Sequence, residues 1–323
     1  MTAVEANSIT HRYGTLTAVD DISFTVNEGE VFGFIGPDGA GKTTLFRIAA
    51  TLIIPSGGRM TLFGLNVVSD FRRLRNQIGY MPGRFSLYHD LTVEENLNFY
   101  ATIFGTTIQE NYYLIEPIYK QIEPFSKRPA GKLSGGMKQK LALSCALIHK
   151  PRILILDEPT TGVDAVSRTE FWEMLSRLKT EGITIIVSTP YMDEALRCDR
   201  IALIQKGKIM GIDTPEKIRR SYDQKLYAVT HPDKYKLLLA LRSMSLPPSP
   251  PDSRNGEPHA PGPGPCAVCS EPFGDSMHVT LEPGTDPGDL VSALSAGGLT
   301  GVTIEEIVPG IEDVFLELMK KEQ

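Results

Sequence analysis

The chain has 323 residues, of which 41% are hydrophobic and 22% charged, and its net charge is −6. This length predicts about two domains, with enough chain to bury a sizeable core. A net acidic chain gains no general attraction to nucleic acid, so we expect no nucleic-acid partner. No apolar run approaches the roughly 20 residues that a membrane-spanning helix needs. The first residues also lack the basic and apolar regions of a signal peptide, so we expect a cytoplasmic protein unless a partner holds it at a membrane.

The four cysteines are too few and too scattered for a disulfide framework. Two of them, Cys266 and Cys269, form a lone C-x-x-C in a stretch rich in proline and glycine. A zinc site would need a second such pair, and a redox motif would need the start of a helix. We therefore interpret both as solvated thiols of a linker.

The first part of the chain predicts β-structure. Residues 22–26 alternate apolar and polar, as in a half-buried strand, and residues 31–35 form a short apolar run typical of a buried strand. Tyr13 lies upstream of both. It either packs against a turn or provides an aromatic surface for a nucleobase, and the residues alone leave both possibilities open.

Residues 36–44 fit the pattern G-x-x-x-x-G-K-[ST], between the strand at 31–35 and a predicted helix at 44–50. In such a loop, the backbone N–H groups and the positive end of the helix dipole cradle phosphates. Lys42 would reach the β- and γ-phosphates, and the hydroxyl of Thr43 would ligate Mg²⁺. The loop predicts a nucleoside triphosphate site, and its residues are Gly36, Pro37, Asp38, Gly39, Ala40, Gly41, Lys42, Thr43 and Thr44.

Helical patterns dominate the middle of the chain. A capping box predicts a helix that begins at Thr92, and a second helical stretch covers about 108–123. Ser134 is a natural N-cap, and Gly135 and Gly136 leave the following helix end bare of side chains. A bare helix N-terminus suits an anion, but a simple hinge explains the same residues equally well.

Two adjacent carboxylates follow the apolar residues 153–156, which predict a buried strand of a parallel sheet. Ligands of open α/β sheets bind at the carboxyl ends of the strands. Asp157 is placed to hold Mg²⁺ directly or through water, and Glu158 to orient or deprotonate an attacking water. The alternative is a structural capping role for both. Further strands at 183–189 and 200–205 predict an α/β fold with a largely parallel sheet.

The pattern changes beyond about residue 220. Residues 246–274 are rich in proline and glycine, and we expect an exposed, partly disordered linker there. We predict a nucleotide-binding domain at 1–220 and a small α+β accessory domain at 221–323 that contains the linker. The accessory domain would have strands at 225–230, 277–281 and 302–308 and helices at 235–244, 289–296 and 311–319.

Together these motifs resemble the ATP-binding subunit of an ABC transporter over about residues 4–220. Residues 133–139 match the ABC signature, which makes the resemblance specific because other P-loop ATPases lack this motif. The drug-export branch typified by daunorubicin-resistance subunits, an ABC-2 type, is the most similar. The other matching segments are Walker A at 36–44, Walker B at 153–158, the D-loop at 162–164 and branch-like phrases at 17–24, 191–195 and 311–316.

The resemblance implies a P-loop cassette with a mostly parallel core, an antiparallel β subdomain and a helical subdomain. It implies ATP and Mg²⁺ as cofactors, with Glu158 as the catalytic glutamate, Thr43 and Asp157 at the metal, and Tyr13 stacked on adenine. In the family, two subunits sandwich two ATP molecules, so residues 134–136 would contact the γ-phosphate bound by a partner. Transmembrane permease subunits would hold the chain at the cytoplasmic face of the membrane and convert hydrolysis into transport.

Three positions depart from the family pattern. Gly83 replaces the glutamine of the Q-loop, Pro190 replaces the switch histidine, and Asp38 replaces an asparagine of the phosphate loop. One hypothesis is a weakened site in the degenerate half of a heterodimer. The other is an ordinary homodimer that tolerates these residues. By family position, residues 85–88 would dock the cytoplasmic helix of the permease.

Three functions fit these residues. The leading one is an ATP-hydrolysing subunit of an ABC-2-type exporter. The second is a nucleotide-binding regulatory partner with little turnover, which Gly83 and Pro190 motivate. The third, a soluble ABC ATPase that acts on ribosomes or DNA, is disfavoured by the acidic charge, the single cassette and the lack of basic stretches. The cargo is not readable here, because transporters select it in their membrane subunits.

Overall fold

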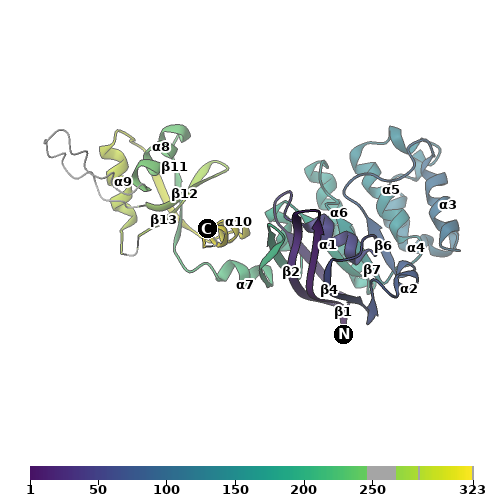
Figure 1. The fold of residues 1–323 in the computed structure, drawn as a ribbon. Helices are drawn as coiled ribbons and strands as arrows, with labels where there is room; N and C mark the ends of the chain where they lie inside the picture. The colour runs from purple at the N-terminus through teal and green to yellow at the C-terminus, as the bar shows by residue number, and fades with distance from the viewer. Residues whose placement is uncertain (246–266, 283, 322–323) are drawn as a thin grey trace. The chain divides into compact units, whose positions relative to one another are not determined.

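A computed structural model describes residues 1–245, 267–282 and 284–321 (Figure 1). The chain divides into two compact units, Met1–Ile218 with Leu318–Gln323, and Arg219–Glu317. The strands of the first unit are β1 (Thr2–Tyr13), β2 (Leu16–Asn27), β3 (Val31–Ile35), β4 (Gly57–Leu62), β5 (Leu65–Asn66), β6 (Ile78–Met81), β7 (Ile153–Asp157), β8 (Thr184–Thr189), β9 (Arg200–Gln205) and β10 (Lys208–Asp213). Its α-helices are α1 (Lys42–Ala49), α2 (Phe71–Arg75), α3 (Val93–Ile103), α4 (Ile108–Tyr119), α5 (Gly135–Leu147), α6 (Ala165–Thr180) and α7 (Pro215–Arg220), with 3-10 turns η1 (Glu123–Phe125), η2 (Ala130–Lys132) and η3 (Met192–Arg197).

The central sheet of the first unit has six strands in the order β10-β9-β3-β8-β7-β6. All neighbouring pairs are parallel except β9 and β10. Every residue of β3, β7 and β8 is buried, which explains why the apolar residues of these strands follow one another without alternation. The predicted α/β fold with a largely parallel sheet is therefore confirmed.

A second, antiparallel sheet has the order β2-β1-β4-β5. Its alternating apolar residues pack with β3 and α1 into one core. Four phenylalanines mark that core: the ring of Phe34 meets Phe24 and Phe46 edge-on, with centroids 5.0 and 5.6 Å apart, and Phe32 lies 5.2 Å from Phe34. This packing fixes the strand that leads into the phosphate loop.

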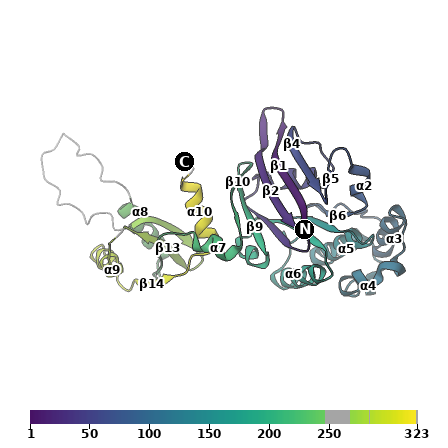
Figure 2. The ribbon, with the colours of Figure 1, turned by 90° about the horizontal axis from the view of Figure 1, so that it is seen from below.

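Helices α3, α4 and α5 lie together at one end of the first unit (Figures 1 and 2). The capping box at Thr92 is present as predicted, since its hydroxyl accepts from Glu95 N and the Glu95 carboxylate accepts from Thr92 N. The prediction of a helix to residue 123 is wrong at its end, because α4 ends at Tyr119. The last part of the predicted stretch forms the separate 3-10 turn η1, which begins at Glu123.

The second unit has the element order β11 (Leu226–Thr230), α8 (Lys234–Ser245), β12 (Ala267–Phe273), β13 (Ser276–Leu281), α9 (Pro287–Ala296), β14 (Thr303–Ile307) and α10 (Ile311–Lys321). Its antiparallel sheet has the order β12-β13-β11-β14, so the first six elements form a split β-α-β arrangement. The apolar face of the sheet packs with α8 and α9. His278 is a residue of β13, as predicted, and its Nδ1 lies 2.7 Å from Oδ1 of Asp313.

The predicted linker at 246–274 is wrong at its C-terminal end. Residues Ala267–Phe273 form β12, which pairs with β13 across a turn at Gly274. Because β12 is an edge strand, Pro272 is tolerated there without loss of a central ladder bond. Cys269 therefore belongs to a strand, whereas Cys266 and the prolines from Pro247 to Pro265 lie outside the described residues.

A half-buried histidine joins the helical region to the central sheet. The His149 ring stacks on Phe104, with centroids 3.8 Å apart, and its Nε2 lies 3.0 Å from the carbonyl oxygen of Ile78. Burial lowers the pKa of His149 from 6.5 to about 4, although the contact with Ile78 opposes the shift. The folded chain therefore keeps this ring neutral at pH values where the unfolded chain protonates it.

This shift predicts that the free energy of unfolding falls as the pH drops from about 6.5 towards 4, because the unfolded state binds the extra proton. A His149→Phe variant keeps a stacked ring but cannot titrate. We expect its stability, measured by urea unfolding at several pH values, to fall less steeply over this range than that of the wild type. Equal slopes for the two proteins would contradict this account of His149.

Candidate functional site

The phosphate loop joins the carboxyl end of β3 to α1, as the sequence predicts. Two of its glycines are required by close packing: a Cβ on Gly36 would lie 2.1 Å from the Ile204 oxygen, and one on Gly41 would lie 2.3 Å from the Ala18 oxygen. Gly41 also has a φ of 101°, a left-handed conformation that favours glycine. Asp38 and its neighbours at the tip of the loop are exposed. The backbone of the loop is thus held from both sides while its tip faces outward.

Lys42 is buried inside this loop. Its Nζ donates to the carbonyl oxygens of Gly36 and Pro37 at 2.8 and 3.0 Å, and it lies 3.2 Å from Oε1 of Glu158. The lysine side chain is only 2% exposed. The arrangement fixes a positive charge among backbone groups that suit an anion, with a single carboxylate as its ionic partner.

Thr43 and Asp157 come together from α1 and β7. The hydroxyl of Thr43 donates to Oδ1 of Asp157 at 3.2 Å, and the hydroxyl of Ser188 donates to the same oxygen at 2.8 Å. Hydroxyl and carboxylate oxygens are the ligands that Mg²⁺ prefers, so these residues fit that ion. Asp157 is 2% exposed, which keeps its carboxylate at one position.

Glu158 is held in an uncommon backbone conformation next to Asp157. Its φ is 50°, which a residue with a side chain adopts only where the surroundings impose it. Its N–H donates to the backbone oxygen of Ser188 at 3.1 Å and to the Ser188 hydroxyl at 3.0 Å. Thr161 also donates to its Oε2 at 3.4 Å. These bonds aim the Glu158 carboxylate at the phosphate loop.

The position of the expected Q-loop glutamine lies against the chain at Asp157 and Glu158. A Cβ on Gly83 would lie 3.1 Å from the backbone oxygen of Asp157 and 3.7 Å from the Glu158 Cβ. Nearby, burial and then the charge of Asp157 raise the pKa of Tyr80 to about 12, although Arg47 opposes the shift. The Tyr80 hydroxyl therefore stays protonated at neutral pH, and Gly83 offers no polar group at this place.

The position of the expected switch histidine lies just beyond β8. Thr189 is tied to the phosphate loop, since its backbone oxygen accepts from Gly36 N at 3.3 Å. Pro190 follows and has neither a ring donor nor a backbone N–H. Tyr191 N donates to the Thr189 hydroxyl at 3.0 Å, which closes the turn.

The signature residues lie at the N-terminus of α5. Ser134 is the N-cap, as predicted, and its hydroxyl accepts from Met137 N at 3.4 Å. Gly135 and Gly136 leave this helix end open, and Ser134 and Gly135 are exposed. Within the described chain, no hydrogen bond or ion pair joins Ser134 to the phosphate loop.

Tyr13 ends β1 and is 45% exposed. Its ring meets His11 edge-on at 4.6 Å. Over the residues that the structure covers, no hydrogen bond or ion pair connects Tyr13 with the phosphate loop either. The stacking of this ring on a base stays a prediction.

Sequence reasoning missed two features of the site. Ser188 bonds to Asp157, the last residue of β7, and to Glu158, which follows it, although in the sequence it is only one residue of the predicted strand at 183–189. Arg168 and Glu194 form a buried ion pair beside the site, at 3.0 Å. Periodicity could not reveal this pair, because its members lie 26 residues apart on different elements.

The fold and the site define a P-loop nucleotide-binding protein: a phosphate loop with its lysine stands opposite two carboxylates at one edge of a parallel sheet. A model of the ABC transporter family matches residues 19–161. The probable multidrug ABC transporter ATP-binding protein YbhF of Escherichia coli K12 is 36% identical over 304 residues, 94% of this chain and 49% of that protein. The Nod factor export ATP-binding protein I of Burkholderia lata is 38% identical over 221 residues, 68% of this chain and 73% of that protein.

A solved structure of the ATP-binding subunit of an ABC transporter is 28% identical, with a TM-score of 0.63 over 68% of this chain and 93% of that one. This chain belongs to the ATP-binding proteins of ABC transporters, a family of ATPases. It spans about half the length of YbhF. None of the helices in the described ranges is long and apolar enough to cross a membrane.

Removing the negative charge of Asp157 tests the metal site. We expect Asp157→Asn to weaken nucleotide binding in the presence of Mg²⁺ by about 10-fold or more, because a hard cation loses an anionic oxygen ligand. Binding in excess EDTA should change little. Calorimetric titration of ATP with and without Mg²⁺ measures both, and an equal loss under the two conditions would contradict the metal role.

Proposed function

We propose that this chain binds and hydrolyses ATP and thereby drives export through separate membrane subunits of the ABC-2 type. One observation carries the proposal: Lys42 and Thr43 of α1 meet Asp157 and Glu158 from the end of β7 at the carboxyl edge of the sheet. Lys42 would exchange its contact with Glu158 for the phosphates of ATP. The released Glu158 carboxylate would then orient the attacking water and accept its proton.

Thr43 and Asp157 would hold Mg²⁺ at this edge of the sheet. The bound ion would neutralise the charge on the phosphate oxygens during transfer. Ser188 keeps the Asp157 carboxylate in place by its hydrogen bond of 2.8 Å. The tie between Thr189 and Gly36 holds β8 against the loop, so the residues that bind and the residues that react move together.

The signature motif supports a dimer of ATP-binding subunits. Ser134, Gly135 and Gly136 form an exposed helix N-terminus without a contact to the phosphate loop of the same described chain. Such a helix end suits the γ-phosphate of an ATP held by a second subunit. Each site would therefore need the Walker motifs of one subunit and the signature of the other.

We propose further that the chain is the degenerate half of a heterodimer. Gly83 lies next to Asp157 and Glu158, and Pro190 follows Thr189, which is bonded to the phosphate loop. These two residues supply neither the amide nor the imidazole of the family pattern. Losing one positioned group in such a transfer typically slows it about 100-fold. Its intact signature would complete the competent site of the partner. An ordinary homodimer that tolerates both residues is the alternative, since Glu158 survives.

An apolar groove on the cassette suits the permease. The cavity of about 660 Å³ lies between the helical region and the central sheet, and Leu87, Tyr100 and Ile103 line it. Arg72 and Arg75 add positive charge at its border. We propose that a cytoplasmic helix of a transmembrane partner docks here, near the segment 85–88, and holds the chain at the cytoplasmic face of the membrane.

The names of the relatives support export as the direction of transport, with the cargo chosen in the membrane subunits. In this proposal, residues 1–220 form the cassette and residues 221–323 form an accessory domain. A second candidate function is a nucleotide-binding regulatory partner with little turnover, which the same two residues, Gly83 and Pro190, favour.

The ATPase rate of the purified chain, alone and mixed with a second ATP-binding subunit, tests the degenerate role. We expect little turnover alone and clear turnover in the mixture. There, Glu158→Gln in this chain should change the rate less than 3-fold, while Ser134→Arg should lower it about 100-fold, because it blocks the partner's γ-phosphate site. A brisk rate for the chain alone that Glu158→Gln abolishes would establish the homodimer instead. ATP binding without turnover in any mixture would favour the regulatory role.

A charge in the groove tests the membrane partner. Ile103 is 59% exposed and lines the groove, whereas Ile54 is 69% exposed and does not line it. We expect Ile103→Asp to lower the membrane-bound fraction of the chain, co-expressed with its permease, by about 5-fold or more, because it buries a charge in an apolar contact. Ile54→Asp should have no effect, and both should bind ATP normally. If the membrane-bound fraction of the chain is the same with and without the permease, the result would indicate a soluble ABC ATPase.

A further inference from the structure

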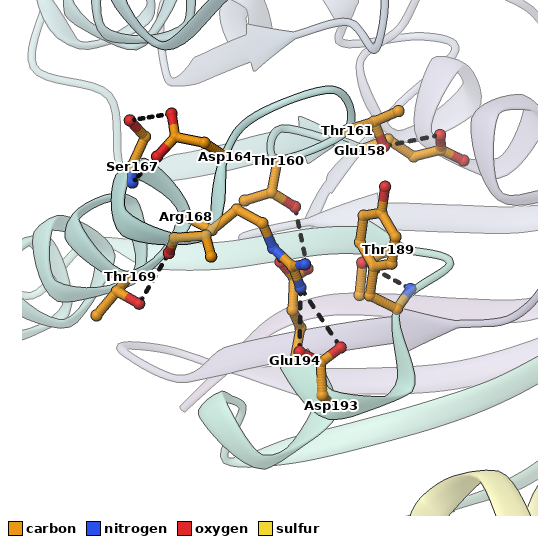
Figure 3. Close-up of polar contacts among 12 residues, drawn as sticks. Glu158, Thr160, Thr161, Asp164, Ser167, Arg168, Thr169, Thr189, Asp193 and Glu194 are labelled. Atoms are coloured by element: carbon orange, nitrogen blue, oxygen red, sulfur yellow. Dashed lines mark hydrogen bonds and ion pairs between the residues drawn. The ribbon is translucent and has the colours of Figure 1, made fainter. Parts of the chain in front are cut away.

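An ionic cluster around the buried Glu194 lies next to the site, between α6 and η3 (Figure 3). Arg168, in the first turn of α6, donates from Nε to Oε1 of Glu194 at 3.0 Å. Its Nη2 donates to Oδ2 of Asp193 at 3.1 Å, and its guanidinium carbon lies 4.3 Å from the centroid of the Tyr191 ring. One arginine therefore holds three residues of the segment that follows β8.

Glu194 is the centre of this cluster. It is 3% exposed, and its second oxygen accepts from the hydroxyl of Thr160 at 3.1 Å. Thr160 is 1% exposed and lies two residues after Glu158. Each oxygen of the buried carboxylate thus has one donor, and the two donors come from different segments. Loss of either donor would leave a charged oxygen without a partner in a place that water does not reach.

The cluster joins the three segments that surround the reacting groups. Thr160 belongs to the segment after β7, Arg168 to the helix that the D-loop residue Asp164 caps, and Glu194 to the segment after β8. Asp164 accepts from Ser167 N at 3.0 Å, so the start of α6 is fixed relative to Arg168 (Figure 3). The strained Glu158 lies at the beginning of the same stretch.

We propose that Arg168 and Glu194 are positioning residues for ATP hydrolysis, because their buried pair fixes the segment 158–164 against the segment after β8. Because Pro190 brings no imidazole, the segment after β8 acts on the site through its backbone and through the pair of Arg168 and Glu194. The inference rests on the proposed function for its effect on turnover, but its effect on the position of 158–164 does not depend on turnover.

The chain contains a matched control for this pair. Asp193 and Glu194 both bind Arg168, but the Asp193 side chain is 75% exposed and that of Glu194 is 3% exposed. An exposed ion pair contributes little, whereas breaking a buried one leaves an uncompensated charge. Glu194→Gln and Asp193→Asn each remove one negative charge that pairs with Arg168, the first at a buried position and the second at an exposed one.

The first measurement is hydrogen exchange of the full chain, followed by mass spectrometry. We expect Glu194→Gln to raise exchange of the 158–164 amides about 10-fold, whereas the strand at 31–35 stays protected. Asp193→Asn should change neither. Unaltered exchange at 158–164 in Glu194→Gln would overturn the inference, whether or not the chain hydrolyses ATP. If Glu194→Gln also loses protection at 31–35, the Thr160→Val variant, which removes a single hydroxyl, replaces it in the test. Faster exchange at 158–164 in that variant supports the inference, and unaltered exchange there overturns it.

The second measurement is the slow ATP turnover of the chain alone, in which every site uses this chain's own Glu158; if the chain alone shows no turnover, the exchange result decides. We expect Glu194→Gln and Arg168→Gln each to lower kcat by about 10-fold or more, with KM within 2-fold of the wild type. The double variant should be no slower than the slower single variant, because both changes break one contact. A change in KM with kcat unchanged, or a loss equal to that of Asp193→Asn, would overturn the positioning role. Absence of turnover in every assembly counts against the proposed function, and the exchange result alone then decides the inference.

Discussion

The parallel register of β3, β8 and β7 is the constraint on which the site depends. Ile35 pairs with Thr189, and Asp157 pairs with Ser188, so the three strands end at one level. Because parallel strands carry their carboxyl ends to the same edge, the phosphate loop after β3 and the carboxylates after β7 must meet there. A shift of one residue would turn Asp157 to the other face of the sheet and separate it from Thr43.

The ion pair between Lys42 and Glu158 follows from that register. It neutralises a buried cation and a carboxylate that would otherwise lie unpaired beside the loop. In the proposed reaction, Lys42 would contact the phosphates and Glu158 would contact the attacking water. The ion pair therefore stabilises this state, and nucleotide binding must break it.

Much of the cassette was predictable because its signals are local. The glycines and lysine of the phosphate loop, the N-cap at Ser134 and the apolar run before Asp157 each predict their structure within a few residues. The strand β12 was not predictable, since it depends on pairing with β13 at an edge where a proline is tolerated. Composition favoured a linker there.

The contacts around the site were also beyond the sequence. Ser188 donates a hydrogen bond to Asp157, 31 residues away in the sequence, and Arg168 donates one to Glu194, 26 residues away. Neither a period nor a motif links such residues. The pairing of β7 with β8 joins the first two, and the packing of α6 beside η3 joins the second two. The departures at Gly83 and Pro190 were visible in the sequence, but the nearness of Gly83 to Asp157 and Glu158 needed the fold.

The most direct test of the account is a crystal structure of the chain with Mg²⁺ and a non-hydrolysable ATP analogue. The account predicts phosphates within the loop at 36–44, Lys42 moved from Glu158 to those phosphates, and the metal beside Thr43 and Asp157. A nucleotide bound elsewhere, or one bound at the loop while Lys42 still pairs with Glu158, would contradict it.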